Sequence, residues 1–315
     1  MSKFLIKLTK VAFLLVFLCF AIQTLINFKI KDKKQYTLQN DWHLLMGVES
    51  SIIFLGNSRV AEHINPAIVD NIFDTDSYLL TQDGQNLEFF YVKLKNYLAY
   101  NIPPKELYCQ FDRSILKPID DLYGFNNYSM FFYNDFMDLT LLSDRKGFRN
   151  LYRYIPALAV SPSMLIKILF SSEIAQEQRF LNTKGFVPNK ADPVNFDNIP
   201  KWSYKINTDK IAFLDSLYDI THRHAIDLYL FNPPQTYVTY KKIINQEILE
   251  NIVLEKNIKY NRDIIFVDFN SERYSNFSLF SNHTHLNKKG SDIFTKELVN
   301  DKRFFKQFRI KGSVY

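Results

Sequence analysis

The sequence is poor in glycine and cysteine: its 315 residues include 8 glycines and 2 cysteines, against 29 phenylalanines and 19 tyrosines. It has no Gly-rich phosphate loop, which argues against a nucleotide-binding protein. The cysteines form no CxxC pair or Cys/His cluster, so we expect no disulfide, metal site or cofactor. No zinc-finger, helix-turn-helix or RNP-like signature accompanies the net charge of +6, so we expect no nucleic-acid partner.

Apolar residues are abundant. They make up 47% of the chain, and 16% of all residues are aromatic. This composition excludes a disordered protein and supports one sizeable core, or at most two domains.

The N-terminus has the pattern of a membrane-targeting segment. Lys3, Lys7 and Lys10 precede an apolar run from Val11 to Ile22, which is typical of a secretory signal or signal anchor. No small-x-small cleavage site follows, which favours an uncleaved anchor. We therefore expect residues 1–34 to be a transmembrane helix with a basic flank. Residues 35–315 would then face the extracytoplasmic side, although lysines flank the run on both sides and the charge count gives no orientation.

Five short apolar runs alternate with helical patterns, as in a parallel sheet. The expected strands cover 51–55, 77–80, 107–111, 226–231 and 264–267. The expected helices cover 67–73, 87–98, 209–223, 240–258 and 290–299. This order predicts a flavodoxin-like, doubly wound α/β fold with about five parallel strands. An irregular, aromatic-rich stretch at about 114–205 reads as a long insertion.

Two segments carry residues suited to acyl transfer. Gly56-Asn57-Ser58 directly follows the first expected strand, and Asn282 to Gly290 follows the last, with a histidine at position 285. In an open parallel sheet, ligands bind beyond the carboxyl ends of the strands, so both segments belong to one edge. A serine hydroxyl there is a candidate nucleophile, and a histidine beside it is a candidate base.

Together these segments resemble the SGNH (GDSL-like) hydrolase and acyltransferase superfamily. Its first motif, G-D/N-S, matches residues 56–58, and its last motif, D-x-x-H followed by L-N, matches residues 282–287 with a downstream Gly290. Gly84 is the counterpart of the second-motif glycine. The resemblance covers about residues 50–115 and 205–300.

The resemblance implies Ser58 as nucleophile, His285 as base, and the backbone N–H groups of Ser58 and Gly84 as oxyanion donors. Asn282 stands where the family has an aspartate, and the third motif, Gly-x-Asn-Asp, is missing. Placement at strand ends adds candidate substrate-binding residues: Asn57, Arg59, Asn86, Asp112 and Asn232. Motif matching supports neither Asp112 nor Asn232.

Two functions follow as expectations. The first is a membrane-anchored serine esterase or O-acyltransferase that acts on acyl esters of cell-envelope polysaccharide. Its partners would be an acylated glycan or acyl donor and a membrane-bound acyltransferase. The second is a non-catalytic envelope protein that binds glycan or a membrane partner, for which the amide at position 282 is the main indication, because an amide cannot stabilise a charged imidazole as a carboxylate does.

Overall fold

The computed structural model describes residues 2–32, 49–81, 83–116, 183–190 and 206–308. Most of the predicted insertion lies outside these residues, as does the predicted boundary between anchor and domain at 34/35. The apolar run at 155–170, read from the sequence as a packed or membrane-facing helix, also lies outside them. The chain divides into two compact units, one containing the N-terminal helix and the other containing the sheet.

The first unit contains α1, Ser2–Asp32. Its stretch Lys3–Ile22 is long and apolar enough to cross a membrane, since about 20 such residues span the hydrocarbon core. A signal sequence has the same length and composition. The N-terminal helix is therefore apolar enough to be a membrane anchor or a signal sequence.

The second unit contains one five-stranded sheet. Its strands are β1 (Ile52–Gly56), β2 (Ser77–Thr81), β3 (Glu106–Gln110), β4 (Asp227–Asn232) and β5 (Ile265–Asp268). They pair in the order β2-β1-β3-β4-β5, and every pairing is parallel. This is the flavodoxin-like order, in which the chain reverses direction across the sheet between β1 and β3. The predicted α/β fold is confirmed.

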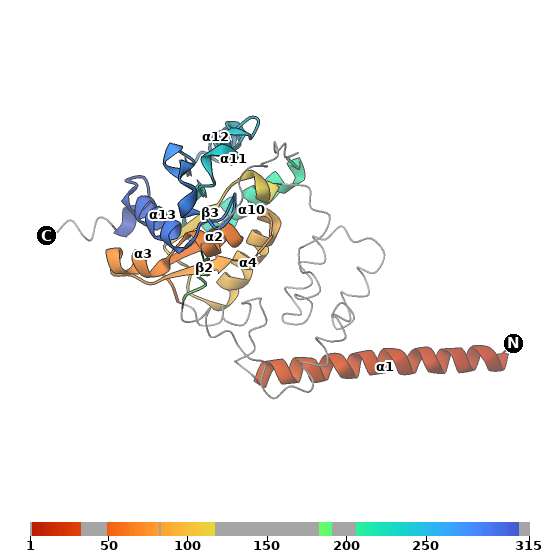
Figure 1. Cartoon of the computed structure of the whole chain (residues 1–315). Helices are drawn as coiled ribbons and strands as arrows, with labels where there is room; N and C mark the ends of the chain where they lie inside the picture. The colour runs from red at the N-terminus through yellow and green to blue at the C-terminus, as the bar shows by residue number, and fades with distance from the viewer. Residues whose placement is uncertain (1, 33–48, 82, 117–182, 191–205, 309–315) are drawn as a thin grey trace. The chain divides into compact units, whose positions relative to one another are not determined.

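Helices cover both faces of the sheet (Figure 1). One face carries α2 (Ser58–His63), α3 (Pro66–Phe73) and α13 (Lys288–Asn300). The other carries α4 (Leu87–Tyr100) and α10 (Thr208–Arg223). The short 3-10 helix η2 (Arg113–Leu116) follows β3, and α11 (Tyr237–Lys241) and α12 (Ile248–Tyr260) follow β4. Two more 3-10 helices, η4 (Glu272–Ser275) and η5 (Phe277–Leu279), follow β5.

The single helix predicted at 240–258 is wrong. The chain forms α11 and α12 with a break at 242–247, where Asn245 has a left-handed backbone with φ 58°. Asparagine tolerates this conformation better than most residues and so ends a helix readily. The break matters because it turns this segment into a wall of the cleft described below.

Asparagine side chains start most of the helices around the sheet. Asn57, Asn65, Asn86, Asn207 and Asn287 each accept a backbone N–H of the first helical turn. Such a cap satisfies an N–H that has no partner within the helix and typically contributes about 1 kcal/mol. These caps fix where each helix leaves the sheet edge.

The core is aromatic, and β1 to β4 are almost entirely buried on both faces, as parallel strands usually are, whereas the edge strand β5 is partly exposed. Tyr108 of β3 stacks on Tyr229 of β4 with ring centroids 4.9 Å apart, and on Phe305 at 4.6 Å. Phe294 and Leu298 of α13 are fully buried in the same cluster. α13 is thereby fixed against the sheet.

The short described stretch 183–190 covers the outer edge of β2. Leu79 donates its N–H to the Lys184 carbonyl at 3.0 Å, and Val187 donates to the Ala61 carbonyl at 2.8 Å. Gly185 is required here, because its φ is +87° and a Cβ would lie 2.5 Å from the Leu79 carbonyl. This end of the predicted insertion is thus part of the α/β domain.

Candidate active site

A cleft of about 240 Å³ opens at the carboxyl edge of the sheet, above the ends of β1, β3, β4 and β5. Six of the residues singled out from the sequence line it: Asn57, Ser58, Arg59, Asp112, Asn232 and His285. The lining also includes Tyr240 of α11 and, from the break that follows α11, Ile243 and Gln246. Within the described residues, no cluster of His, Cys, Asp and Glu is arranged to hold a metal ion.

Ser58 is held in place by the turn that joins β1 to α2. The Asn57 side chain caps the helix by accepting the Arg59 N–H at 3.0 Å, and the Asn57 N–H donates to Gln110 Oε1 at 2.9 Å. Gly56 is required because a Cβ there would lie 2.2 Å from Val60 Cγ2. The turn therefore projects the Ser58 hydroxyl from the first residue of α2 into the cleft.

His285 meets Ser58 directly, although 227 positions separate them in the chain. The distance from Ser58 Oγ to His285 Nε2 is 2.8 Å. His285 sits in a tight loop that its own backbone closes, since the Ser281 N–H donates to the His285 carbonyl at 2.9 Å. We call these two residues the Ser58–His285 pair.

Asn282 sets the tautomer of His285. Its Oδ1 accepts the backbone N–H groups of Thr284 and His285, each at 3.0 Å, and lies 3.0 Å from His285 Nδ1. Because backbone N–H groups only donate, the atom facing them is the amide oxygen. His285 Nδ1–H therefore donates to it, which leaves Nε2 free of a proton and able to accept the Ser58 hydroxyl hydrogen.

Gly290 gives the histidine loop its close packing. A Cβ at this position would lie 2.1 Å from the Leu279 carbonyl oxygen and 2.9 Å from Leu286 Cδ2. The Gly290 N–H also donates to the Asn287 cap at 3.1 Å. A glycine is therefore needed at position 290 for steric reasons, because any side chain would clash with the loop.

The electrostatic surroundings of His285 disfavour its charged form. Burial, and secondarily the nearby positive charge of Arg59, lower the pKa of His285 to about 4. A low dielectric and a like charge both penalise an imidazolium. The ring is thus a neutral acceptor at pH 7, and nothing in the described site compensates the charge it would take up.

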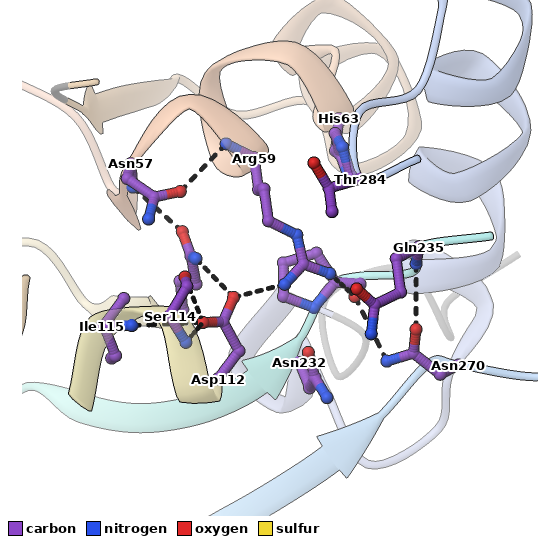
Figure 2. Close-up of polar contacts among 12 residues, drawn as sticks. Asn57, Arg59, His63, Asp112, Ser114, Ile115, Asn232, Gln235, Asn270 and Thr284 are labelled. Carbon is purple, nitrogen blue, oxygen red and sulfur yellow. Dashed lines mark hydrogen bonds and ion pairs between the residues drawn. The ribbon is translucent and has the colours of Figure 1, made fainter. Parts of the chain in front are cut away.

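Arg59 is the central cation of the cleft (Figure 2). Its guanidinium pairs with the Asp112 carboxylate and donates to the Pro233 carbonyl, and both charged side chains are almost fully buried. Asp112 also accepts from Gln110 Nε2 at 2.6 Å and from the Ser114 N–H at 2.7 Å. These partners engage the Asp112 carboxylate, so it acts in this structure as an anchor for Arg59.

Asn232 and Asp268 form the far wall. Asn232 Nδ2 donates to Asp268 Oδ2 at 3.2 Å, and the Tyr240 hydroxyl donates to the same oxygen at 3.1 Å. Because the amide nitrogen must face the carboxylate, the Asn232 oxygen faces away from it, and this buried oxygen has no hydrogen-bond partner among the described residues. Burial, and secondarily the neighbouring Asp268 carboxylate, raises the pKa of the Tyr240 hydroxyl, so Tyr240 stays a neutral donor.

Gly84 and Asn86 lie beside the cleft and are not among the described residues that line it. Gly84 is in the turn after β2 with φ +67°. Gln85, the next residue, accepts Asn57 Nδ2 through its carbonyl at 3.4 Å, which places this turn next to the Ser58 turn. Asn86 caps α4 through its side-chain oxygen, which accepts the Phe89 N–H at 3.2 Å.

Several residues of the site were not found from the sequence. Gln110 links Asn57 to Asp112 from the end of β3, where the missing third motif would stand. Tyr240 and Asp268 were also missed, although the position of Asp268 at the end of β5 was a usable signal. His63, fully buried behind His285, gave no sequence signal at all.

The chain matches no protein-family model, and no curated protein sequence matches it. Among solved structures it is similar to an acetyl xylan esterase (Est2A) from the rumen bacterium Butyrivibrio proteoclasticus, with 8% sequence identity and a TM-score of 0.37. The alignment covers 84% of this chain and 65% of the esterase, so the chain spans less than two thirds of that protein. A similarity this low leaves the function to be inferred from the geometry of the site.

Proposed function

We propose that this protein is a membrane-anchored serine esterase or O-acyltransferase of the SGNH type. One observation carries the proposal: Ser58 Oγ, the His285 imidazole and Asn282 Oδ1 form a continuous hydrogen-bonded line at the cleft, with steps of 2.8 and 3.0 Å. A serine hydroxyl that donates to an oriented, neutral histidine is the arrangement that generates an oxygen nucleophile.

The proposed reaction has two steps. Ser58 Oγ attacks the ester carbonyl while its proton passes to His285 Nε2, and the backbone N–H of Ser58 stabilises the oxyanion. Gly84, in the turn beside the cleft, is the second donor that the family resemblance implies. The alcohol leaves with the proton from Nε2, which forms an acyl-serine. Water or a sugar hydroxyl then gives its proton to Nε2 as it attacks the acyl carbon. The bond from the acyl carbon to Ser58 Oγ breaks as the Nε2 proton returns to that oxygen, which restores the free serine.

The substrate is proposed to be an acyl ester of a cell-envelope polysaccharide. The cleft is lined mainly by amides, hydroxyls and charged groups, and such side chains suit a hydroxyl-rich ligand. An anchoring α1 would place the domain at the envelope on the extracytoplasmic side, where a membrane-bound acyltransferase is a suitable partner. Hydrolysis and transfer differ only in which acceptor reaches the acyl-serine.

A second candidate function is a non-catalytic protein that binds glycan at the same cleft. The pKa of His285 near 4 and the amide at position 282 favour it, because both weaken a base that must become charged.

A fluorophosphonate probe separates the two candidates. The enzyme predicts labelling of full-length protein that is lost in Ser58→Ala and strongly reduced in His285→Ala, with Ser278→Ala, an exposed serine outside the cleft, as the matched control. Absence of labelling in folded protein, together with retained binding of acylated glycan, would support the binding protein.

A further inference from the structure

His63 connects the two halves of the Ser58–His285 pair. It is the last residue of α2, the helix that begins with Ser58. Its Nε2 accepts the backbone N–H of Leu286, the residue directly after His285, at 3.1 Å. Its ring meets the His285 ring edge-on, with centroids 6.2 Å apart and planes at 88°. One side chain therefore joins the helix of the nucleophile to the loop of the base.

Only one form of His63 makes this contact. To accept a hydrogen bond at Nε2, the ring must be neutral and carry its proton on Nδ1. Full burial, followed by the charges of Arg59 and His285, holds the pKa of His63 well below its ordinary value, and this outweighs the opposite effect of the Thr284 backbone. The acceptor is thus available throughout the neutral range.

The environment makes the contact costly to lose. Leu286 is fully buried, and a buried N–H left without an acceptor costs about 1–3 kcal/mol. If His63 no longer accepts this N–H, the loop relieves the cost by moving away from α2, and His285 moves with the loop. Thr295 of α13 lies beside the end of α2: its Oγ1 accepts the Asn65 N–H at 2.9 Å and is 3.4 Å from the His63 carbonyl oxygen, which ties this end of α2 to α13.

From this geometry, and resting on the proposed function, we propose that His63 is a positioning residue. By accepting the Leu286 N–H, it holds the His285 ring at hydrogen-bonding distance from Ser58 in the tautomer that accepts the serine proton. It touches neither substrate nor the reacting atoms.

The test uses full-length protein in detergent with 15N-labelled histidine, which gives six side chains to assign. His63→Leu removes the acceptor at similar bulk, whereas His63→Gln retains an acceptor near the position of Nε2. Val69→Ala, at a fully buried site on α3, controls for general loss of stability. The readouts are the imidazole tautomers by NMR and the rate of fluorophosphonate labelling.

The proposal expects wild-type His63 and His285 both to carry the proton on Nδ1. His63→Leu should shift His285 to a mixture of tautomers and slow labelling about tenfold or more, as loss of a supporting partner typically does. His63→Gln and Val69→Ala should stay within about threefold of the wild type.

A wild-type His63 protonated on Nε2 would overturn the proposal, and this measurement decides even if His63→Leu does not fold. Equal effects of the Leu and Gln substitutions would also overturn it. Failure of the wild type to label contradicts the proposed function alone, because the tautomers are observed without any reaction.

Discussion

Asn282 presents its side-chain oxygen to His285 Nδ1 at 3.0 Å, and two backbone N–H groups hold that oxygen in place. The amide thus performs the orienting half of the task that a carboxylate performs in a serine triad. It lacks the other half, the negative charge that stabilises the imidazolium.

Replacement of Asn282 by aspartate should therefore increase activity. The carboxylate retains the acceptor geometry and raises the pKa of His285 above about 4. The expected gain in ester hydrolysis lies between about tenfold and the 10⁴-fold that separates Asp from Asn in known triads. Hydrolysis of a p-nitrophenyl ester measures it, with Asn282→Leu as the loss-of-orientation control. No gain in a folded, probe-reactive variant would contradict the orienting role.

The rate of probe labelling should depend on pH through His285. The base acts only when neutral, so labelling should rise as the pH increases through about 4 and stay level through neutral pH. In Asn282→Asp the rise should move to higher pH. A wild-type midpoint near the ordinary value of 6.5 would show that the ring is less buried than described.

Stability should pass through a maximum near pH 6.5. His63 and His285 have lowered pKa values in the folded state, so the unfolded chain binds more protons below 6.5 and stability falls on acidification, by up to about 1.4 kcal/mol per pH unit for each ring. Glu62 acts in the opposite sense, because burial, and secondarily the Asp83 charge, raises the pKa of its carboxyl to about 8. The stability that protonated Glu62 contributes is therefore lost as the pH rises from 4.5 to about 8.

Melting temperature measured from pH 5 to pH 9 tests both limbs. Glu62→Gln can still accept the Asn189 amide hydrogen bond and has no titratable group. It should therefore remove most of the alkaline decline and steepen the acid decline below pH 6.5, where Glu62 opposes the two histidines. A parallel shift of the whole curve would show that Glu62 does not titrate in this range.

The buried pair Arg59–Asp112 should show strong coupling. Arg59→Met alone leaves a buried carboxylate without its cation and should cost on the order of 3–5 kcal/mol. The double variant with Asp112→Asn keeps an acceptor for the Ser114 N–H and should recover much of that loss. Chemical denaturation of both variants and of Asp112→Asn completes the cycle, and additive effects would mean that the two charges do not depend on each other.

Gly290→Ala should loosen the histidine loop. The added methyl group meets the Leu279 carbonyl at 2.1 Å, and relief requires backbone movement, so a loss of about 1–3 kcal/mol is expected. Probe labelling should slow as well, because His285 moves with the loop. A Gly290→Ala variant as stable as the wild type would contradict this steric explanation.

The fold was readable from the sequence because its signals are local. Each buried strand is a short apolar run, and asparagines mark the helix starts. The Ser58 turn and the Asn282–His285 loop were readable for the same reason, since each motif closes its own hydrogen bonds within a few residues.

The remaining features depend on contacts between distant parts of the chain. The His63–Leu286 hydrogen bond joins residues 223 positions apart, and no local pattern distinguishes His63 from another buried helical residue. The break at Asn245 was missed because apolar spacing continues across it. Gln110 and Tyr240 become part of the site only once neighbouring strands are placed side by side.

The position of the Ser58–His285 pair in the chain has a consequence for biosynthesis. The serine belongs to the first strand-helix turn, whereas the histidine and the helix that locks its loop come at the end of the domain. During synthesis, Ser58 is made early, whereas His285 is present only after most of the domain has been synthesised. Until α13 docks against α2 and α3, a nascent or truncated chain carries a serine with no partner to activate it. Assembly of the pair therefore coincides with completion of the fold.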